Sequence, residues 1–136
     1  MFVKSDEYSN LTSKIIGCAM EVHNALGSGF PEVIYQRALN LEFYSQGLLA
    51  NREVEVPIYY KDVLIGTRRV DFLVNDFICV ELKAVSQMEA RHLAQAINYL
   101  EAFRLEIGLL INFGSGKLQF RRVYNNKIKD KTRMKG

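Results

Sequence analysis

Residues 68–85, RRVDFLVNDFICVELKAV, form two short apolar segments separated by an Asn-Asp pair. β-Branched and aromatic residues are frequent on both sides of that pair, so the segment predicts two antiparallel strands joined by a tight turn. Three charged residues, Asp71, Glu81 and Lys83, lie within these otherwise apolar strands. Because burial of charged groups is costly unless they are paired or bind a ligand, they restrict the folds that the chain can adopt.

The rest of the chain predicts helices on both sides of these strands. Apolar residues at steps of three and four predict helices at residues 11–26, 31–45 and 88–104. Alternating or β-branched runs predict strands at residues 53–60, 63–74, 77–85, 106–113 and 118–124. Strands in a meander are antiparallel, whereas a strand reached through a helix is usually parallel. We therefore expect one α/β (mixed α+β) domain over residues 1–126, with element order ααβββαββ and helices flanking a central mixed sheet.

The formal net charge of +3 is concentrated at the C-terminus. The basic tail at residues 127–136, KIKDKTRMKG, has five Lys or Arg and one Asp, which gives +4 and leaves about −1 for residues 1–126. The body is therefore not a general polyanion binder. Affinity for nucleic acid has to come from local patches and from this tail, unless the tail is only a solvated terminus.

The sequence favours a cytoplasmic protein. It has no run of about 18 apolar residues, so we expect no membrane span. Residues 1–10 carry acidic and polar side chains before any apolar segment, which is unlike a signal peptide. Cys18 and Cys79 lie in apolar segments without metal-ligand spacing, and we expect both to be buried and reduced. The oligomeric state does not follow from the sequence, and a homodimer is left open.

Whether Asp71 and Glu81 meet depends on the turn between their strands. Opposed residues of a hairpin have a constant sum of residue numbers. A two-residue Asn-Asp loop sets Asp71 opposite Val80 and away from Glu81, whereas a three-residue loop or a bulge sets it opposite Glu81. Asn and Asp tolerate the positive φ that the longer loop needs. Glu81 and Lys83, two residues apart, share a face in either case.

Opposed carboxylates on a sheet repel each other, and partial burial increases the cost. Lys83 supplies one positive charge to offset it. A divalent cation would supply two more, and oxygen ligands suit Mg²⁺ or Mn²⁺. Asp71 and Glu81, with the backbone carbonyl of Leu82, would form a partial oxygen cage that leaves positions for water and phosphate.

The alternative is a salt-bridge ladder on an exposed strand face. Apolar residues argue against it, because they fill one expected face at Val70, Phe72, Val74, Ile78, Val80 and Leu82. Leu73 and Cys79 accompany the charged residues on the other face. We therefore expect strands that are buried on both sides except at one polar spot.

The pattern Asp71-x9-Glu81-x-Lys83 resembles the core of the PD-(D/E)XK nuclease superfamily, which has the restriction-endonuclease-like fold. Val70 stands where the named motif has proline. GFPEVIY, at residues 29–35, is similar to the G-x-x-E-x-x-Y signature of one bacterial and archaeal branch of that superfamily. EVHNALGSG and LLINFGSGKLQFRRV also resemble this branch, so the resemblance spans nearly the whole chain.

The resemblance implies further site residues. Glu32 would be an additional acidic residue beside the metal, although a helix N-terminus also favours a carboxylate. Tyr35, three residues later, would share its side of the helix. Gln95 and Tyr99 resemble the Q-x-x-x-Y element of RecB-like and Cas4-like nucleases, which faces the active site. Arg91 extends that stripe, for which the alternative is a solvated helix flank.

The implied function is metal-dependent hydrolysis of nucleic-acid phosphodiester bonds by a metal-activated water. The expected catalytic residues are Glu32, Asp71, Glu81 and Lys83. The expected supporting or nucleic-acid-binding residues are Tyr35, Gln95, Tyr99 and Arg69. The expected ligands of Mg²⁺ or Mn²⁺ are Asp71, Glu81, the Leu82 carbonyl and, through water, Glu32.

DNA is favoured over RNA as the substrate, and Arg68, Arg69 and the basic tail would contact phosphates. No base-reading element is evident, so no sequence specificity is predicted. The alternative function is a non-catalytic nucleic-acid- or protein-binding module on the same fold. The presence of all four charged positions favours catalysis.

Overall fold

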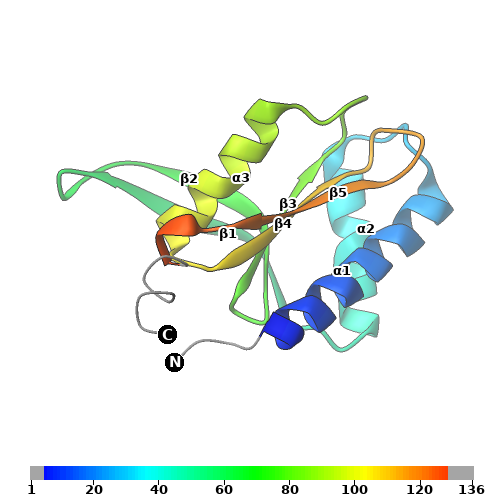
Figure 1. Ribbon diagram of the computed structural model, residues 1–136. Helices are drawn as coiled ribbons and strands as arrows, with labels where there is room; N and C mark the ends of the chain where they lie inside the picture. The colour runs from blue at the N-terminus through cyan, green and yellow to red at the C-terminus, as the bar shows by residue number, and fades with distance from the viewer. Residues whose placement is uncertain (1–4, 129–136) are drawn as a thin grey trace.

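The computed structural model describes residues 5–128 and shows helices packed on a five-stranded sheet (Figure 1). The elements are α1 (Ser5–Leu26), α2 (Glu32–Ser45), β1 (Ala50–Tyr60), β2 (Val63–Val74), β3 (Ile78–Lys83), α3 (Ala90–Phe103), β4 (Ile107–Asn112) and β5 (Gln119–Tyr124). The predicted order is confirmed, except that α1 begins at Ser5 instead of Leu11. Residues 129–136 of the predicted basic tail lie outside the described residues.

The strands lie in the order β1-β2-β3-β4-β5, so neighbours in sequence are neighbours in space. β3 and β4 are parallel, and the other pairs are antiparallel. The parallel pair is the one joined through α3, as a helical crossover requires. α1 and α2 cover one face of the sheet and α3 covers the other (Figure 1). The predicted mixed sheet with flanking helices is confirmed. Within residues 5–128, no helix is long and apolar enough to cross a bilayer.

Alternation along β3 divides its side chains between two apolar cores. Val80 and Leu82 pack in the core beneath α1 and α2. Cys79 packs in the core beneath α3. Because residues two apart share a face, Glu81 and Lys83 are directed to the α3 side. The charged positions of β3 therefore lie between the sheet and α3.

The β1–β2 hairpin changes face at Glu53 and Asp71. The ladder skips these two positions, and Glu53 has a φ of 56°. Phe72 packs beneath α1 and α2, whereas Val70 packs beneath α3, although the two residues are separated by only one position. The expectation that Val70 and Phe72 share one apolar face is therefore wrong. The bend at Glu53 reverses which side chains of the outer half of the hairpin face α3. Asp71 lies at the position where this change of face occurs.

Asn112, the last residue of β4, fixes the chain that follows β3. Its Oδ1 accepts hydrogen bonds from the N–H groups of Val85 at 2.9 Å and Gly114 at 3.0 Å. Its Nδ2 donates to the Val85 carbonyl at 2.9 Å and to Gln119 Oε1 at 2.9 Å. Since Val85 follows Lys83 by two residues, this buried amide also restrains the end of the strand that carries Lys83.

Close contact at Gly114 predicts a stability defect. A Cβ added there would lie 2.4 Å from both the backbone N and O of Val85. We expect Gly114→Ala to lower the free energy of unfolding by about 1–3 kcal/mol, because the backbone at Val85 has to shift. Urea denaturation measures this change. Gly116→Ala is the matched control, since an added Cβ meets nothing within 4 Å. Equal stability of the two variants would contradict the packing described here.

Candidate active site

The turn between β2 and β3 has the three-residue form that brings Asp71 to Glu81. The ladder pairs Val74 with Ile78, which leaves residues 75–77 as the loop. The first two loop residues, Asn and Asp, have φ values of 51° and 62°. These lie in the left-handed region that Asn and Asp tolerate. Of the two geometries that the sequence allowed, the structure has the one in which the carboxylates meet.

The Asp71 side chain accepts a hydrogen bond from the backbone of β3, and the Glu81 side chain accepts one from the backbone of β2. The Leu82 N–H donates to Asp71 Oδ2 at 2.8 Å, and the Asp71 N–H donates to Glu81 Oε1 at 2.9 Å. In a regular ladder, backbone carbonyls would accept from these two N–H groups. The β2–β3 ladder ends one pair earlier, at Phe72 and Val80. The two strands therefore separate here, and carboxylate oxygens lie between them.

Gln36 on α2 holds the second oxygen of Asp71. Its Nε2 donates to Asp71 Oδ1 at 2.8 Å, and the residue is only 5% exposed. Its own Oε1 is buried and has no hydrogen-bond partner among the described residues. Gln36 was not among the site residues expected from the sequence. The available signal was its spacing of four residues from Glu32, which places both side chains on one side of α2.

Lys83 is held by an amide and not by a carboxylate. Its Nζ donates to Gln95 Oε1 on α3 at 2.8 Å. Within residues 5–128, the ion pairs closer than 4.0 Å are Arg91 with Glu89 and Lys127 with Glu101. Direct compensation of the carboxylates by Lys83, as expected from the sequence, is therefore not seen. The ammonium group is positioned next to the carboxylates but does not contact them.

Glu32, the first residue of α2, lies at the edge of the same site. With Lys83, His92 and Gln95 it lines a cavity of about 360 Å³. Burial raises the pKa of Glu32, and the charge of Lys83 opposes that rise. Among the described residues, no three His, Cys, Asp or Glu side chains lie close enough together to hold a metal ion.

Tyr35 points away from the site and is fully buried. Its hydroxyl donates to the Gly27 carbonyl at 2.5 Å and accepts from the Phe30 N–H at 3.1 Å. Because its ring is fully buried, Tyr35 has no surface for direct contact with nucleic acid, which was one of the roles expected for it. Its hydrogen bonds instead fix the loop from which α2 begins, and so support the position of Glu32.

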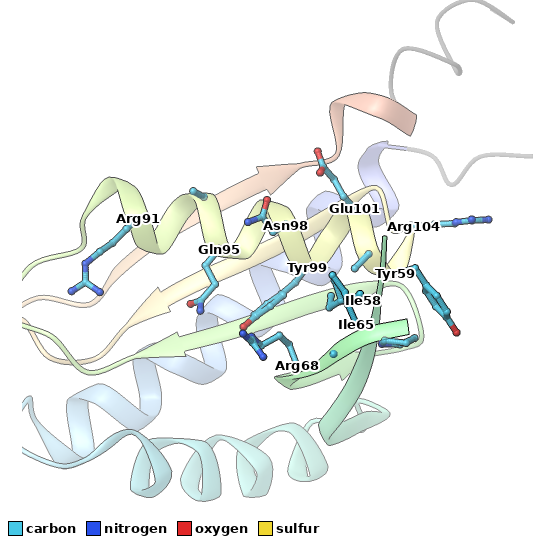
Figure 2. Close-up of a pocket in the computed structure, with 14 residues that line it drawn as sticks. Ile58, Tyr59, Ile65, Arg68, Arg91, Gln95, Asn98, Tyr99, Glu101 and Arg104 are labelled. Carbon is cyan, nitrogen blue, oxygen red and sulfur yellow. The ribbon is translucent and has the colours of Figure 1, made fainter. Parts of the chain in front are cut away.

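Tyr99 and Arg68 approach each other between α3 and β2 (Figure 2). Burial raises the pKa of the Tyr99 hydroxyl, Glu81 adds to the rise and Arg68 opposes it. Arg69 lies opposite Glu55 in the register of the β1–β2 ladder. Because adjacent strand residues face opposite sides, Arg69 points away from Tyr99. Of the two arginines expected to contact phosphates, Arg68 is therefore the one that lies beside α3.

This geometry agrees with the comparison to known protein families. The model of the PD-(D/E)XK nuclease superfamily matches residues 9–123. The chain belongs to this superfamily. Among solved structures it is similar to one titled "Crystal structure of SSO0001", with a TM-score of 0.55 and 19% sequence identity. That match covers 74% of this chain and 56% of the other, so it shows the fold alone. No curated protein matches this chain.

Nucleases of the PD-(D/E)XK superfamily generally use divalent metals, and the donors present here fit such an ion. Asp71 and Glu81 supply carboxylate oxygens. The N–H and C=O of one strand residue face the same strand edge, so the Leu82 carbonyl is directed to the side on which Asp71 accepts its N–H. Mg²⁺ is usually bound by one or two carboxylates and keeps several waters. Two carboxylates and a carbonyl are therefore a sufficient protein contribution.

Other groups of the protein do not fully balance the negative charges of Asp71 and Glu81. Glu81 is only 6% exposed. Burial, and then the charge of Asp71, raise its pKa to about 8. Burial also raises the pKa of Asp71, although the hydrogen bonds from Leu82 and Gln36 oppose that rise. A cation between the two carboxylates would reverse the repulsion, so the electrostatics agree with the donor set.

The raised pKa of Glu81 predicts pH-dependent stability when divalent ions are removed. The folded protein keeps this proton up to about pH 8, whereas an unfolded chain releases it near pH ~4.3. The folded state binds more protons between these values, so its free energy of unfolding should fall as the pH rises from about 5 to about 8. Urea denaturation in EDTA measures this slope.

Glu81→Gln is the control for this effect, because it keeps an acceptor oxygen for the Asp71 N–H and cannot ionise. We expect a flatter dependence on pH in this variant. The same slope in both proteins would assign the effect to other groups and contradict the raised pKa of Glu81.

Proposed function

We propose that this protein is a metal-dependent nuclease that hydrolyses phosphodiester bonds in nucleic acid. The observation that supports this most directly is that the Asp71 and Glu81 carboxylates each accept a backbone hydrogen bond from the other's strand, while Gln95 holds Lys83 beside them. This arrangement joins two oxygen donors and one cationic group at a single edge. We also propose that the chain belongs to the branch named for its G-x-x-E-x-x-Y signature, on the strength of Gly29, Glu32 and Tyr35.

In this proposal Asp71, Glu81 and the Leu82 carbonyl would hold Mg²⁺ or Mn²⁺, which would supply water activation and polarisation of the phosphoryl oxygen when bound. Lys83 orients the attacking water and stabilises the charge that develops on the phosphate. Gln95 keeps the ammonium group in place for both tasks. Glu32, whose pKa is raised by burial, contacts the site through water.

The substrate is nucleic acid, with DNA favoured. Arg68 and Arg91 are exposed and lie close enough to the catalytic residues to contact flanking phosphates. Contacts of this kind make binding strongly dependent on salt concentration.

Loss of Lys83 tests the proposed function. We expect Lys83→Ala to reduce cleavage by about 10²–10⁴-fold, because the orientation of the attacking water and the stabilisation of charge on the phosphate are both lost. Cleavage of labelled single- and double-stranded DNA and RNA, with Mg²⁺ or Mn²⁺ present, measures this. Lys117→Ala is the matched control, since Lys117 lies in the exposed turn between β4 and β5. Cleavage that is equal in wild type and Lys83→Ala would reveal a contaminant and refute the assignment.

Gln36 tests the metal site separately from activity. Gln36→Leu has nearly the same shape, removes an unpartnered buried oxygen and deletes the donor to Asp71 Oδ1. We expect about 10–100-fold weaker binding of Mn²⁺ by calorimetry, because ligand orientation is lost. The control Gln46→Leu changes the exposed residue after α2 and should bind like wild type. If the wild-type protein binds neither Mn²⁺ nor Mg²⁺, the non-catalytic binding module is the better description.

A further inference from the structure

A groove of about 830 Å³ lies between α3 and the outer half of the β1–β2 hairpin. Arg91, Gln95 and Tyr99 line it from α3, and Figure 2 shows Tyr99 directed toward Arg68 of the hairpin. Arg68, Ile58 and Ile65 line it from the hairpin side (Figure 2). The bend at Glu53 and Asp71 is what brings this part of the hairpin beneath α3.

The groove leads to the candidate active site. Arg91 and Gln95 line both the groove and the cavity that contains Glu32 and Lys83. Gln95 is also the hydrogen-bond partner of Lys83. A chain lying in the groove would therefore reach the catalytic residues at one end without leaving the surface formed by α3.

The lining of the groove favours an anionic occupant. Three arginines, Arg68, Arg91 and Arg104, line it together with one carboxylate, Glu101, which pairs with Lys127 at 3.5 Å. Arg91 pairs with Glu89 at 2.8 Å, but both side chains are mostly exposed. Exposed pairs of this kind contribute little stability, so Arg91 can exchange Glu89 for a phosphate at low cost.

The same groove also exposes aromatic and aliphatic surface. Tyr59 is 62% exposed and Ile65 is 63% exposed. The register of the hairpin shifts between Ile58 and Tyr59, so both of these adjacent residues line the groove. A duplex presents mainly phosphates to a protein surface of this shape, and its base faces are stacked inside. A single strand presents phosphates and free base faces together, and arginines interspersed with aromatic rings match that combination.

We propose that this groove binds single-stranded nucleic acid and leads it to the catalytic residues. Arg68 and Arg91 contact the backbone phosphates, and Tyr59 stacks on a base. The direction of the strand toward Lys83 rests on the proposed nuclease function. The substrate class is then single strands, or the single-stranded ends of duplexes, of DNA or RNA.

Equilibrium binding in EDTA tests the groove without cleavage. Fluorescence anisotropy is measured with labelled single-stranded DNA and RNA of about 12 nucleotides and with the matched DNA duplex, at one fixed salt concentration. We expect single strands to bind at least about tenfold more tightly than the duplex. Tyr59→Ala and Arg68→Ala should each weaken single-strand binding about tenfold, as expected for loss of one stacked base or one phosphate contact.

Tyr44→Ala and Arg121→Ala are the matched controls. Tyr44 is 85% exposed on α2, and Arg121 is exposed on β5 at the opposite edge of the sheet. Both should bind like wild type. The DNA and RNA strands distinguish the two sources of the shared chemistry, and tighter binding of either one supports the groove.

Duplex binding as tight as single-strand binding would overturn this inference, as would wild-type affinity in Tyr59→Ala and Arg68→Ala. Either result is separate from the nuclease assignment, which depends on cleavage that requires Lys83. Conversely, groove-dependent binding of single strands without such cleavage supports the groove and refutes the nuclease.

Discussion

The exchange of backbone partners between β2 and β3 is the interaction on which the site depends. Two N–H groups that would pair with carbonyls in a regular sheet instead donate to Asp71 and Glu81. The same oxygens are therefore part of the sheet and part of the site. Their position is fixed by the register of the hairpin, which the three-residue loop sets. The cost is two carboxylates in one buried place, seen in the raised pKa values of both.

Neutral amides, one from each helical layer, position the charged groups of this site. Gln36 reaches Asp71 from α2, and Gln95 reaches Lys83 from α3. Amides can fix a carboxylate or an ammonium group without neutralising it. The carboxylates and Lys83 therefore keep their charges, which the proposed function assigns to binding of a cation and of a phosphate. Asn112, on the neighbouring strand β4, is a third amide that restrains this region, because it holds the backbone that follows Lys83.

The sequence predicted what depends on local pattern. Element order and most boundaries follow from hydrophobic period and turn residues, and the shared face of Glu81 and Lys83 follows from strand alternation. What it could not predict depends on how elements are rotated against one another. Tyr35 and Gln36 are adjacent on α2, yet only contact with β2 shows that Gln36 faces Asp71. The outer half of the hairpin changes face at Glu53, a single residue with left-handed backbone conformation. Without knowledge of that bend, the sequence could not show that Val70 packs beneath α3, or which of Arg68 and Arg69 faces α3.

The double use of the Asp71 carboxylate has a consequence for how the proposed activity could be lost. Replacement of Asp71 by an apolar residue leaves the Leu82 amide without its acceptor, in a region where unpaired amides are costly. Lys83 bonds to another side chain, so its replacement leaves this strand pairing intact. Mutational drift toward an inactive descendant therefore meets its lowest barrier at the lysine. A relative that retains both carboxylates but lacks the lysine would be the expected vestige of a lost enzyme.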